Sequence, residues 1–209
     1  MSHRHDYGGA ARASTMDGVE IERRFLVDGR GPRPWLDSNE GVVPMMQVYL
    51  PDGCLEVEAG RGALFANGRL LVEGLEAALI ERVQARNDWV VRLRQEGARG
   101  TLTLKGPRVG AVGPEEEADV PVGLVRSYLD DMSLPMIVKG RYLWRADDGH
   151  LWEIDEFEGP LAGLIIAEVE LNQEDEAVDL PAFVGLEVTH AGPSWSSHGL
   201  ASLTLSTQR

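Results

Sequence analysis

Charged side chains of like sign stand two positions apart in one segment of this chain after another. Glu20 and Glu22 form one such pair, and Arg92 and Arg94 form another, each around an apolar residue. Successive side chains of a β-strand point to opposite faces, so the members of a pair share a face. Seven predicted strands repeat one plan, with charged residues on one face and bulky apolar residues on the other. Their charged residues are Glu20, Glu22, Arg24, Arg92, Arg94, Lys105, Glu117, Asp119, Lys139, Arg141, Glu153, Asp155, Glu168 and Glu170.

A sheet with one solvated face and one packed face explains any single strand of this kind. Two features favour another interpretation for the whole set. The charges come in like-sign pairs, which a merely solvated face does not require, and the opposite faces are apolar enough to be covered by helices. A barrel of about eight strands encloses a space that holds one small ligand. We therefore predict that the charged faces converge inside a closed barrel.

Burying so many charges is costly unless they are paired or bind ions, so the arrangement suits binding better than stability. Carboxylates are ligands that Mg²⁺ or Mn²⁺ prefers, and these cations also bridge phosphate oxygens. Arginine forks and lysine point charges suit phosphate. The predicted phosphate-binding residues are Arg24, Arg92, Arg94, Lys105, Lys139 and Arg141, and the candidate metal ligands are Glu20, Glu22, Glu117, Asp119, Glu153, Asp155, Glu168 and Glu170.

The balance of these charges predicts a requirement for metal. Six cations against eight carboxylates leave a net charge of −2, which two divalent cations would turn to +2. A triphosphate with roughly four or five negative charges could then be held, and without metal hardly at all. We expect two divalent cations, Mg²⁺ or Mn²⁺, as cofactors.

The elements that must position these residues are mostly strands, so the fold class is α+β with a strong bias to strands. The turn Asn67-Gly68 predicts a hairpin. Helices are expected over residues 74–87 and 122–132, and short turns or helical pieces include 181–185 and 194–203. The predicted strands are 19–27, 43–50, 63–66, 69–72, 89–95, 101–106, 115–120, 137–146, 150–157 and 164–171. Residues 1–16, with His3 and His5, are predicted to be a disordered tail, and residues 17–209 a single domain.

Composition narrows the class of protein. The chain has 209 residues, 43% hydrophobic and 26% charged, and a net charge of −14, which argues against nucleic acid or anionic membrane as a partner. No apolar run is long enough to cross a bilayer, and the N-terminus lacks the apolar segment of a signal peptide. The single cysteine, Cys54, excludes an internal disulfide and suits a reducing cytoplasm. We expect a cytoplasmic protein with a small-molecule partner, and the sequence leaves a homodimer open.

These residues resemble the CYTH family, also called triphosphate tunnel metalloenzymes. The segment Glu20 to Val27 is similar to the family signature E-x-E-x-K near the N-terminus. Further matches follow in family order and span residues 20 to about 200. They are Val91-Arg92-Leu93-Arg94, Leu104-Lys105-Gly106, Glu117-Ala118-Asp119-Val120-Pro121, Lys139-Gly140-Arg141-Tyr142, Trp152-Glu153-Ile154-Asp155 and Ala167-Glu168-Val169-Glu170-Leu171.

The resemblance implies an eight-stranded antiparallel tunnel with flanking helices that hydrolyses inorganic, thiamine or nucleoside triphosphate. Matching positions make Glu20, Glu22, Glu168 and Glu170 metal ligands, assisted by Asp155, Glu117 and Asp119. One metal would orient the triphosphate, and the other would lower the pKa of an attacking water. The predicted catalytic residues are Arg24, Lys105 and Asp155.

Three features depart from the family pattern. Arg24 replaces the signature lysine, residues 51–88 resemble an insertion, and residues 194–201 differ from the asparagine-bearing ending that the family leads us to expect. A triphosphatase acting on inorganic triphosphate is the favoured function. An adenylate cyclase or thiamine triphosphatase of the same family and a binding module without turnover are the alternatives. A lipocalin-like carrier fits less well, because its cavity would be mostly apolar.

Overall fold

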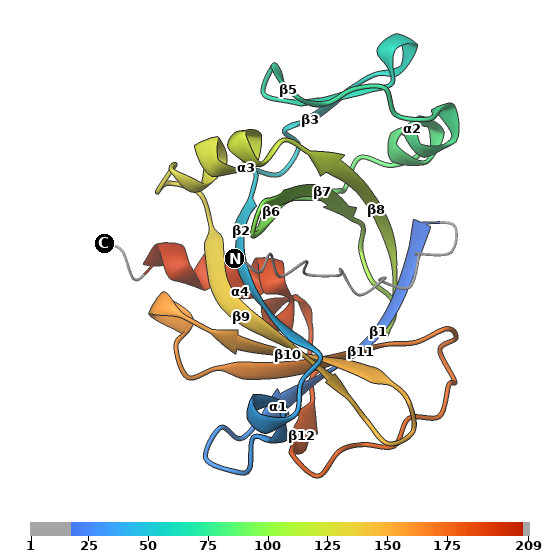
Figure 1. Cartoon of the computed structure of the whole chain (residues 1–209). Coiled ribbons are helices and arrows are strands. Elements are labelled where there is room, and N and C mark those ends of the chain that lie inside the picture. The colour runs from blue at the N-terminus through green and yellow to red at the C-terminus, as the bar shows by residue number, and fades with distance from the viewer. Residues whose placement is uncertain (1–17, 207–209) are drawn as a thin grey trace, which may run out of the picture.

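Strands with one charged and one apolar face can enclose the charged faces by curling into a barrel. The computed structural model describes residues 18–206 and shows this closure (Figure 1). The barrel strands are β1 (Val19–Val27), β2 (Gly41–Tyr49), β6 (Val90–Glu96), β7 (Arg99–Lys105), β8 (Val112–Val120), β9 (Met136–Arg145), β10 (Leu151–Phe157) and β11 (Ile165–Glu170). Within the described range these eight strands follow one another around the ring as β1, β8, β7, β6, β2, β9, β10 and β11, and β11 pairs with β1 again. Each neighbouring pair is antiparallel. The predicted barrel is confirmed.

Strand β1 closes the barrel, because it pairs with both β8 and β11. Its start pairs with β8, with Glu20 opposite Gly113, and its middle and end pair with β11, from Glu22 opposite Glu170 to Leu26 opposite Ile166. Beyond β8, the short strand β12 (Val184–Glu187) takes the free edge of β1.

A second, three-stranded sheet lies on one side of the barrel in Figure 1, at the top of the view. It consists of β3 (Leu55–Glu58), β4 (Ala63–Ala66) and β5 (Arg69–Val72), and helix α2 (Ala77–Gln84) follows it. Positive φ angles at Asn67 and Gly68 confirm the predicted hairpin turn. Buried apolar residues from this unit pack with Leu93 and Leu102 on the outward face of the barrel, and Cys54 is buried among them.

The opposite side of the barrel has a separate apolar layer. Trp152 and Ile154 of β10 point outward and pack with Phe25, Trp35 and Ala167. Trp35 belongs to the single-turn helix α1 (Pro34–Asp37). Apolar cover on both sides leaves the inward faces to the charged residues, as the alternation predicts.

One end of the barrel has an apolar interior. The inward-facing positions Ile137, Phe157 and Ile166 continue the charged rows of their strands and pack with Leu200 and Ala201. Those two residues belong to helix α4 (Ser197–Ser206), which lies against β9 and β2. The predicted tunnel is therefore covered by α4 at this end.

Most predicted elements are present with shifted ends. Helix α2 is shorter than expected, α3 (Val122–Leu129) ends earlier, and β8 begins three residues sooner. The expectation of a turn or helical piece at residues 181–185 was wrong in part, because β12 begins at Val184. Strand β12 pairs with one neighbour, so its sequence needs no buried alternating face. Helix α1 and strand β3 were not predicted. The expected tail with His3 and His5 lies outside the described residues. Among the described helices, none is long and apolar enough to cross a bilayer.

Candidate functional site

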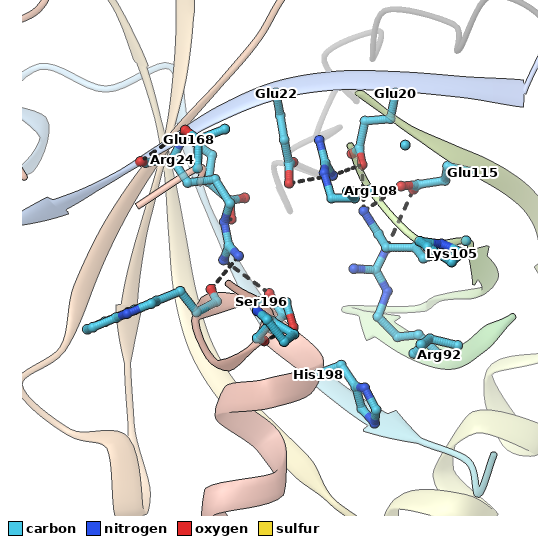
Figure 2. Close-up of a pocket in the computed structure, with 18 of the residues that line it drawn as sticks. Glu20, Glu22, Arg24, Arg92, Lys105, Arg108, Glu115, Glu168, Ser196 and His198 are labelled. Atoms are coloured by element: carbon cyan, nitrogen blue, oxygen red, sulfur yellow. Dashed lines mark hydrogen bonds and ion pairs between the residues drawn. The ribbon is translucent and has the colours of Figure 1, made fainter. Parts of the chain in front are cut away.

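The inward faces of the barrel strands enclose a cavity of about 910 Å³ (Figure 2). Of the residues that the structure describes, eight arginines or lysines and eight carboxylates line it. The cations are Arg24, Arg92, Arg94, Arg99, Lys105, Arg108, Lys139 and Arg141. The carboxylates are Glu20, Glu22, Asp88, Glu115, Glu117, Glu153, Glu168 and Glu170. The formal charges of the lining balance, so a polyanion that enters the cavity needs further cations or displaces carboxylates.

The seam between β1 and β11 places opposite and like charges face to face. Arg24 lies opposite Glu168, and its Nε donates to the Glu168 carboxylate at 2.7 Å. Glu22 lies opposite Glu170, another carboxylate. Burial and the negative charges of Glu20 and Glu168 raise the pKa of Glu22. A cation bound near Glu22 would relieve this repulsion.

Strands β9 and β10 form a dense group of ion pairs. Asp155 is fully buried and receives Nε and Nη2 of Arg141, each at 2.6 Å, together with Nζ of Lys139. Arg141 also contacts Glu153 and donates to Glu168 at 2.8 Å. Arg141 of β9 therefore contacts both β10 and β11, and Asp155 holds Lys139 and Arg141 in place.

Lys139 has an unusual electrostatic environment for a lysine. Only 2% of the residue is exposed, although its side chain borders the cavity. Burial and the positive charge of Arg141 lower the pKa of Lys139 to about 8, in spite of the nearby Asp155. Lys139 can thus lose its proton in mildly alkaline solution.

The wall formed by β6, β7 and β8 carries a chain of contacts. Arg92 Nη2 donates to Thr103 Oγ1 at 3.0 Å, and Thr103 Oγ1 donates to Glu117 at 2.8 Å. Arg94 Nη2 donates to the same Glu117 carboxylate at 3.2 Å. Two arginine forks are thus held by one wall, at a spacing that the strand fixes.

Lys105 connects that wall to β1. Its Nζ lies 2.7 Å from Glu20 and also pairs with Glu115. Burial raises the pKa of Glu115 to about 8, and the charge of Glu20 adds to the rise although Lys105 opposes it. Burial and the charge of Glu20 thus favour the protonated form of Glu115 beside the ion pair of Lys105 and Glu20.

Helix α4 begins inside the cavity, next to Arg24 (Figure 2). Arg24 Nη1 donates to the Trp195 carbonyl at 2.5 Å, and its Nη2 lies 3.5 Å from Ser197 Oγ. The His198 ring lies 5.2 Å from that of Tyr49 on β2. The arginine in the signature position thus fastens the helix that covers one end of the barrel.

The structure brings together twelve of the fourteen charged residues predicted from the sequence, all of which lie within residues 18–206. Asp119 and Asp155 are not in the lining. The Asp119 side chain is 74% exposed and pairs with Arg99, while Asp155 lies behind Lys139 and Arg141. Both share the parity of the inward residues, but parity does not determine the depth of a side chain along the barrel.

Comparisons with known proteins bear on this arrangement. The family model of the CYTH domain matches residues 79–191, more than half of the chain. The chain belongs to the CYTH domain family. An inorganic triphosphatase of Acetivibrio thermocellus is 40% identical to it over 173 residues, which cover 82% of this chain and 86% of that protein.

Two further relatives support the CYTH assignment. An inorganic triphosphatase of Nitrosomonas europaea is 35% identical over 173 residues, which cover 82% of this chain and 89% of that protein. The crystal structure of an inorganic triphosphatase superposes with a TM-score of 0.51 and 27% identity, and the match covers 87% of this chain and 97% of the other.

The CYTH cavity contains residues that the sequence reasoning missed. Glu115 shares the parity of Glu117, and Tyr49 shares that of the other inward residues of β2, so alternation could have found both. Arg108 lies between β7 and β8, outside any strand, and alternation gives no information there. The start of α4 was expected to be helical, but its place in the barrel was not predicted.

CYTH triphosphatases depend on metal ions, so the carboxylates must be tested as metal ligands. Within residues 18–206, no three carboxylate, histidine or cysteine side chains stand together in a group ready to hold a metal. Arginines and lysines lie between the carboxylates instead. The donor chemistry fits a hard divalent cation, because Glu20, Glu22, Glu168 and Glu170 offer oxygens on two adjacent strands. These carboxylates would have to exchange cationic partners for the metal.

Proposed function

We propose that this chain hydrolyses inorganic triphosphate to pyrophosphate and orthophosphate with the help of divalent cations. The cavity is the observation that carries the proposal, because its eight cations come almost entirely from rigid strands of one closed barrel. Relatives that are 40% and 35% identical are named inorganic triphosphatases, and they support the choice of substrate. Addition of one water across a phosphoanhydride bond accounts for both products.

Binding and orientation fall to the cations of the two walls. Arg92 and Arg94 present forks from β6, and Arg141 presents one from β9 on the other side of β2, so phosphate oxygens can be bound from more than one direction. Lys105 and Lys139 add point charges. Strand-borne groups in a largely enclosed space are fixed before the substrate arrives, which is how electrostatic preorganisation lowers a barrier.

The metal is assigned to the carboxylates at the β1–β11 seam. Glu20, Glu22, Glu168 and Glu170 would hold it, with Glu117 and Glu153 near the walls of the same cavity. When bound, divalent cations neutralise phosphate charge and make water a better nucleophile. We give Asp155 the role of a positioning residue for Lys139 and Arg141, since both of its oxygens are engaged by them. Mg²⁺ and Mn²⁺ are the cations to test, and a cytoplasmic location fits the single unpaired cysteine.

Arg24 is proposed as both a phosphate contact and a fastening for α4. Its fork already reaches Glu168 and the Trp195 carbonyl, so a phosphate at this end would meet a guanidinium with fixed orientation. A lysine at the same position would replace the two separate donors of a rigid plane by one amine and would match the two acceptors less well.

A substrate panel tests the function. The full chain is incubated with inorganic triphosphate, thiamine triphosphate or ATP, with Mg²⁺ or Mn²⁺ and with chelator, and orthophosphate and cyclic AMP are measured separately. We expect orthophosphate release, fastest from inorganic triphosphate, and no release with chelator. Cyclic AMP without orthophosphate would identify a cyclase. Metal-assisted binding without any product would identify a binding module.

A further inference from the structure

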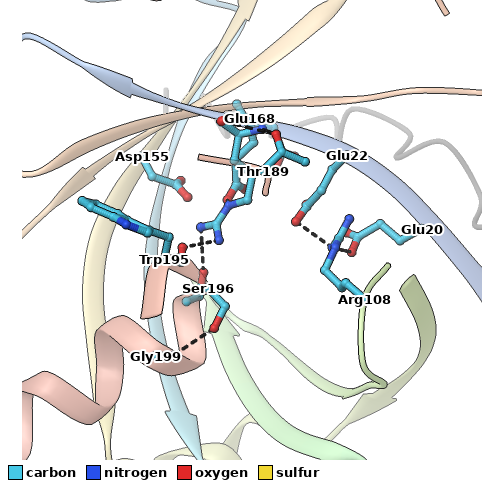
Figure 3. A network of polar contacts seen from close by, with 12 residues as sticks. Glu20, Glu22, Arg108, Asp155, Glu168, Thr189, Trp195, Ser196 and Gly199 are labelled. Carbon is cyan, nitrogen blue, oxygen red and sulfur yellow. Dashed lines mark hydrogen bonds and ion pairs between the residues drawn. The ribbon is translucent and has the colours of Figure 1, made fainter. Parts of the chain in front are cut away.

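Arg108 occupies the place between the two signature carboxylates. Its Nη1 donates to Glu20 at 2.9 Å and to Glu22 at 2.7 Å, and its Nη2 donates to the Ala111 carbonyl of its own loop (Figures 2 and 3). One nitrogen thus bridges two acidic side chains that share a face of β1. The guanidinium therefore occupies the place where the same carboxylate oxygens could coordinate a divalent cation.

Arg108 lies in the loop between β7 and β8, whereas the other arginines and lysines of the cavity lie in strands. Among the cavity-lining arginines and lysines of the described residues, Arg108 is the one that lies outside a strand. Its side chain is 26% exposed, so water reaches it in place. Paired backbone hydrogen bonds between Val109 and Val112, at 2.9 and 3.2 Å, close the loop in addition to the contact from Arg108 to the Ala111 carbonyl. These backbone bonds do not depend on the position of the guanidinium.

Space for the stem of Arg108 depends on a glycine. Gly113 lies opposite Glu20 in the β1–β8 pairing, and a Cβ atom there would lie 2.7 Å from Arg108 Cγ. The strand therefore lacks a side chain at the point where the Arg108 stem passes. This clearance allows the guanidinium to reach the carboxylates.

The contacts of Glu22 make the bridge significant. Among the described residues, Arg108 is the one side-chain donor to the Glu22 carboxylate. The Glu20 carboxylate accepts a second hydrogen bond, from Lys105. The two cations Arg108 and Lys105 are shared by three carboxyl groups, Glu20, Glu22 and Glu115, so the group keeps an excess of acidic side chains. A divalent cation would satisfy them better and would repel the guanidinium.

We propose that Arg108 is a built-in counter-cation that a divalent metal displaces from Glu20 and Glu22, and that the freed guanidinium then binds the triphosphate. The inference rests on the proposed function, which supplies both the metal and the polyanion. Metal binding removes both acceptors of Nη1, and the phosphate oxygens of a substrate in the same cavity are the acceptors within reach. Arg108 therefore opposes metal binding and favours substrate binding.

Calorimetric titration of Mn²⁺ alone into the full chain tests the first half. Arg108→Ala should bind Mn²⁺ about tenfold more tightly than the wild type, the change that corresponds to 1.4 kcal/mol. Arg99→Ala is the matched control, because it removes one positive charge from the same lining without touching Glu20 or Glu22. The control should stay within about twofold of the wild type, since only a general change in the electrostatic field remains.

The second half is tested by kinetics at saturating Mn²⁺. Arg108→Ala should raise the KM for inorganic triphosphate at least about fivefold and change kcat little, as the loss of a substrate contact does. Gly113→Ala keeps all charges and pushes the Arg108 stem aside, so it should tighten Mn²⁺ binding as well. If Arg108→Ala proves unstable, Gly113→Ala provides the same readout.

Unchanged or weaker Mn²⁺ affinity in both Arg108→Ala and Gly113→Ala would overturn the displacement of Arg108. The proposed function would still stand if the wild type hydrolysed triphosphate. Tighter binding in Arg99→Ala to the same degree would also overturn it, because the general field would explain the effect. No Mn²⁺ binding by the wild type, together with hydrolysis that chelator does not stop, would overturn both the inference and the proposed metal requirement.

Discussion

Arg24 of β1 and Glu168 of β11 form an ion pair at 2.7 Å across the seam that closes the barrel. The same arginine also donates to the Trp195 carbonyl, just before the start of α4. The Arg24 side chain therefore joins β1 to β11, contacts the segment that leads into α4 and lines the cavity. A phosphate that binds Arg24 meets a group fixed on two sides.

Arg24→Lys should lower the free energy of unfolding by about 1–2 kcal/mol, because a single amine matches the two acceptors of the Nε and Nη1 donors less well than the planar fork does. Urea unfolding measures the change. Arg23→Lys is the matched control, since Arg23 pairs with Glu187 outside the cavity. Equal losses in the two variants would show that the Arg24 fork does not fasten α4.

Glu20→Gln should reduce hydrolysis of inorganic triphosphate at saturating metal by at least about a hundredfold, because a neutral amide is a poor ligand for a hard cation. Initial rates measure the loss, and the unfolding midpoint reports on the fold. Glu187→Gln makes the same change on the outside of the barrel and should keep nearly the full rate. A nearly normal rate in Glu20→Gln would rule out Glu20 as a metal ligand.

The KM for triphosphate should rise as the pH passes 8, because Lys139 loses its charge near that pH. Lys139→Arg keeps the charge at all working pH values and should flatten this rise. The depressed pKa has a second effect with a definite sign. Between pH 8 and about 10.5 the unfolded lysine holds a proton that the folded one lacks, so this group makes the protein more stable as the pH rises. An identical pH profile for wild type and variant would exclude Lys139 as the cause.

His150 ties the β9–β10 turn to the segment after β11. Its ring lies 2.8 Å from Asp148 and 3.1 Å from Glu176, and contact with Asp148 raises the pKa of His150 in spite of some burial. A raised pKa stabilises the fold below the ordinary histidine pKa, and this contribution is lost as the pH rises through the folded value. His150→Gln should therefore cost more stability at pH 5.5 than at pH 8.5 in urea unfolding. An equal cost at both pH values would mean that the histidine acts through its shape and not through its charge.

Alternation in the sequence determines which face a residue occupies, and it therefore predicted the inward rows that include Glu22, Arg94 and Lys139. It does not determine depth, so Asp155 and Asp119 were assigned to the site although one lies behind the lining and the other at an exposed edge. Arg108 could not be predicted, because its position depends on a loop and on the space beside Gly113. The cover by α4 depends on tertiary packing against residues distant in the chain.

A crystal structure of the full chain soaked with inorganic triphosphate and Mn²⁺ tests the charged cavity most directly. We predict an anomalous manganese signal beside Glu20 and Glu22 and phosphate density in contact with Arg92, Arg94 and Arg141. Manganese or phosphate bound solely outside the barrel, with the carboxylates still paired to arginine and lysine, would contradict the assignment of this cavity as the site of triphosphate hydrolysis.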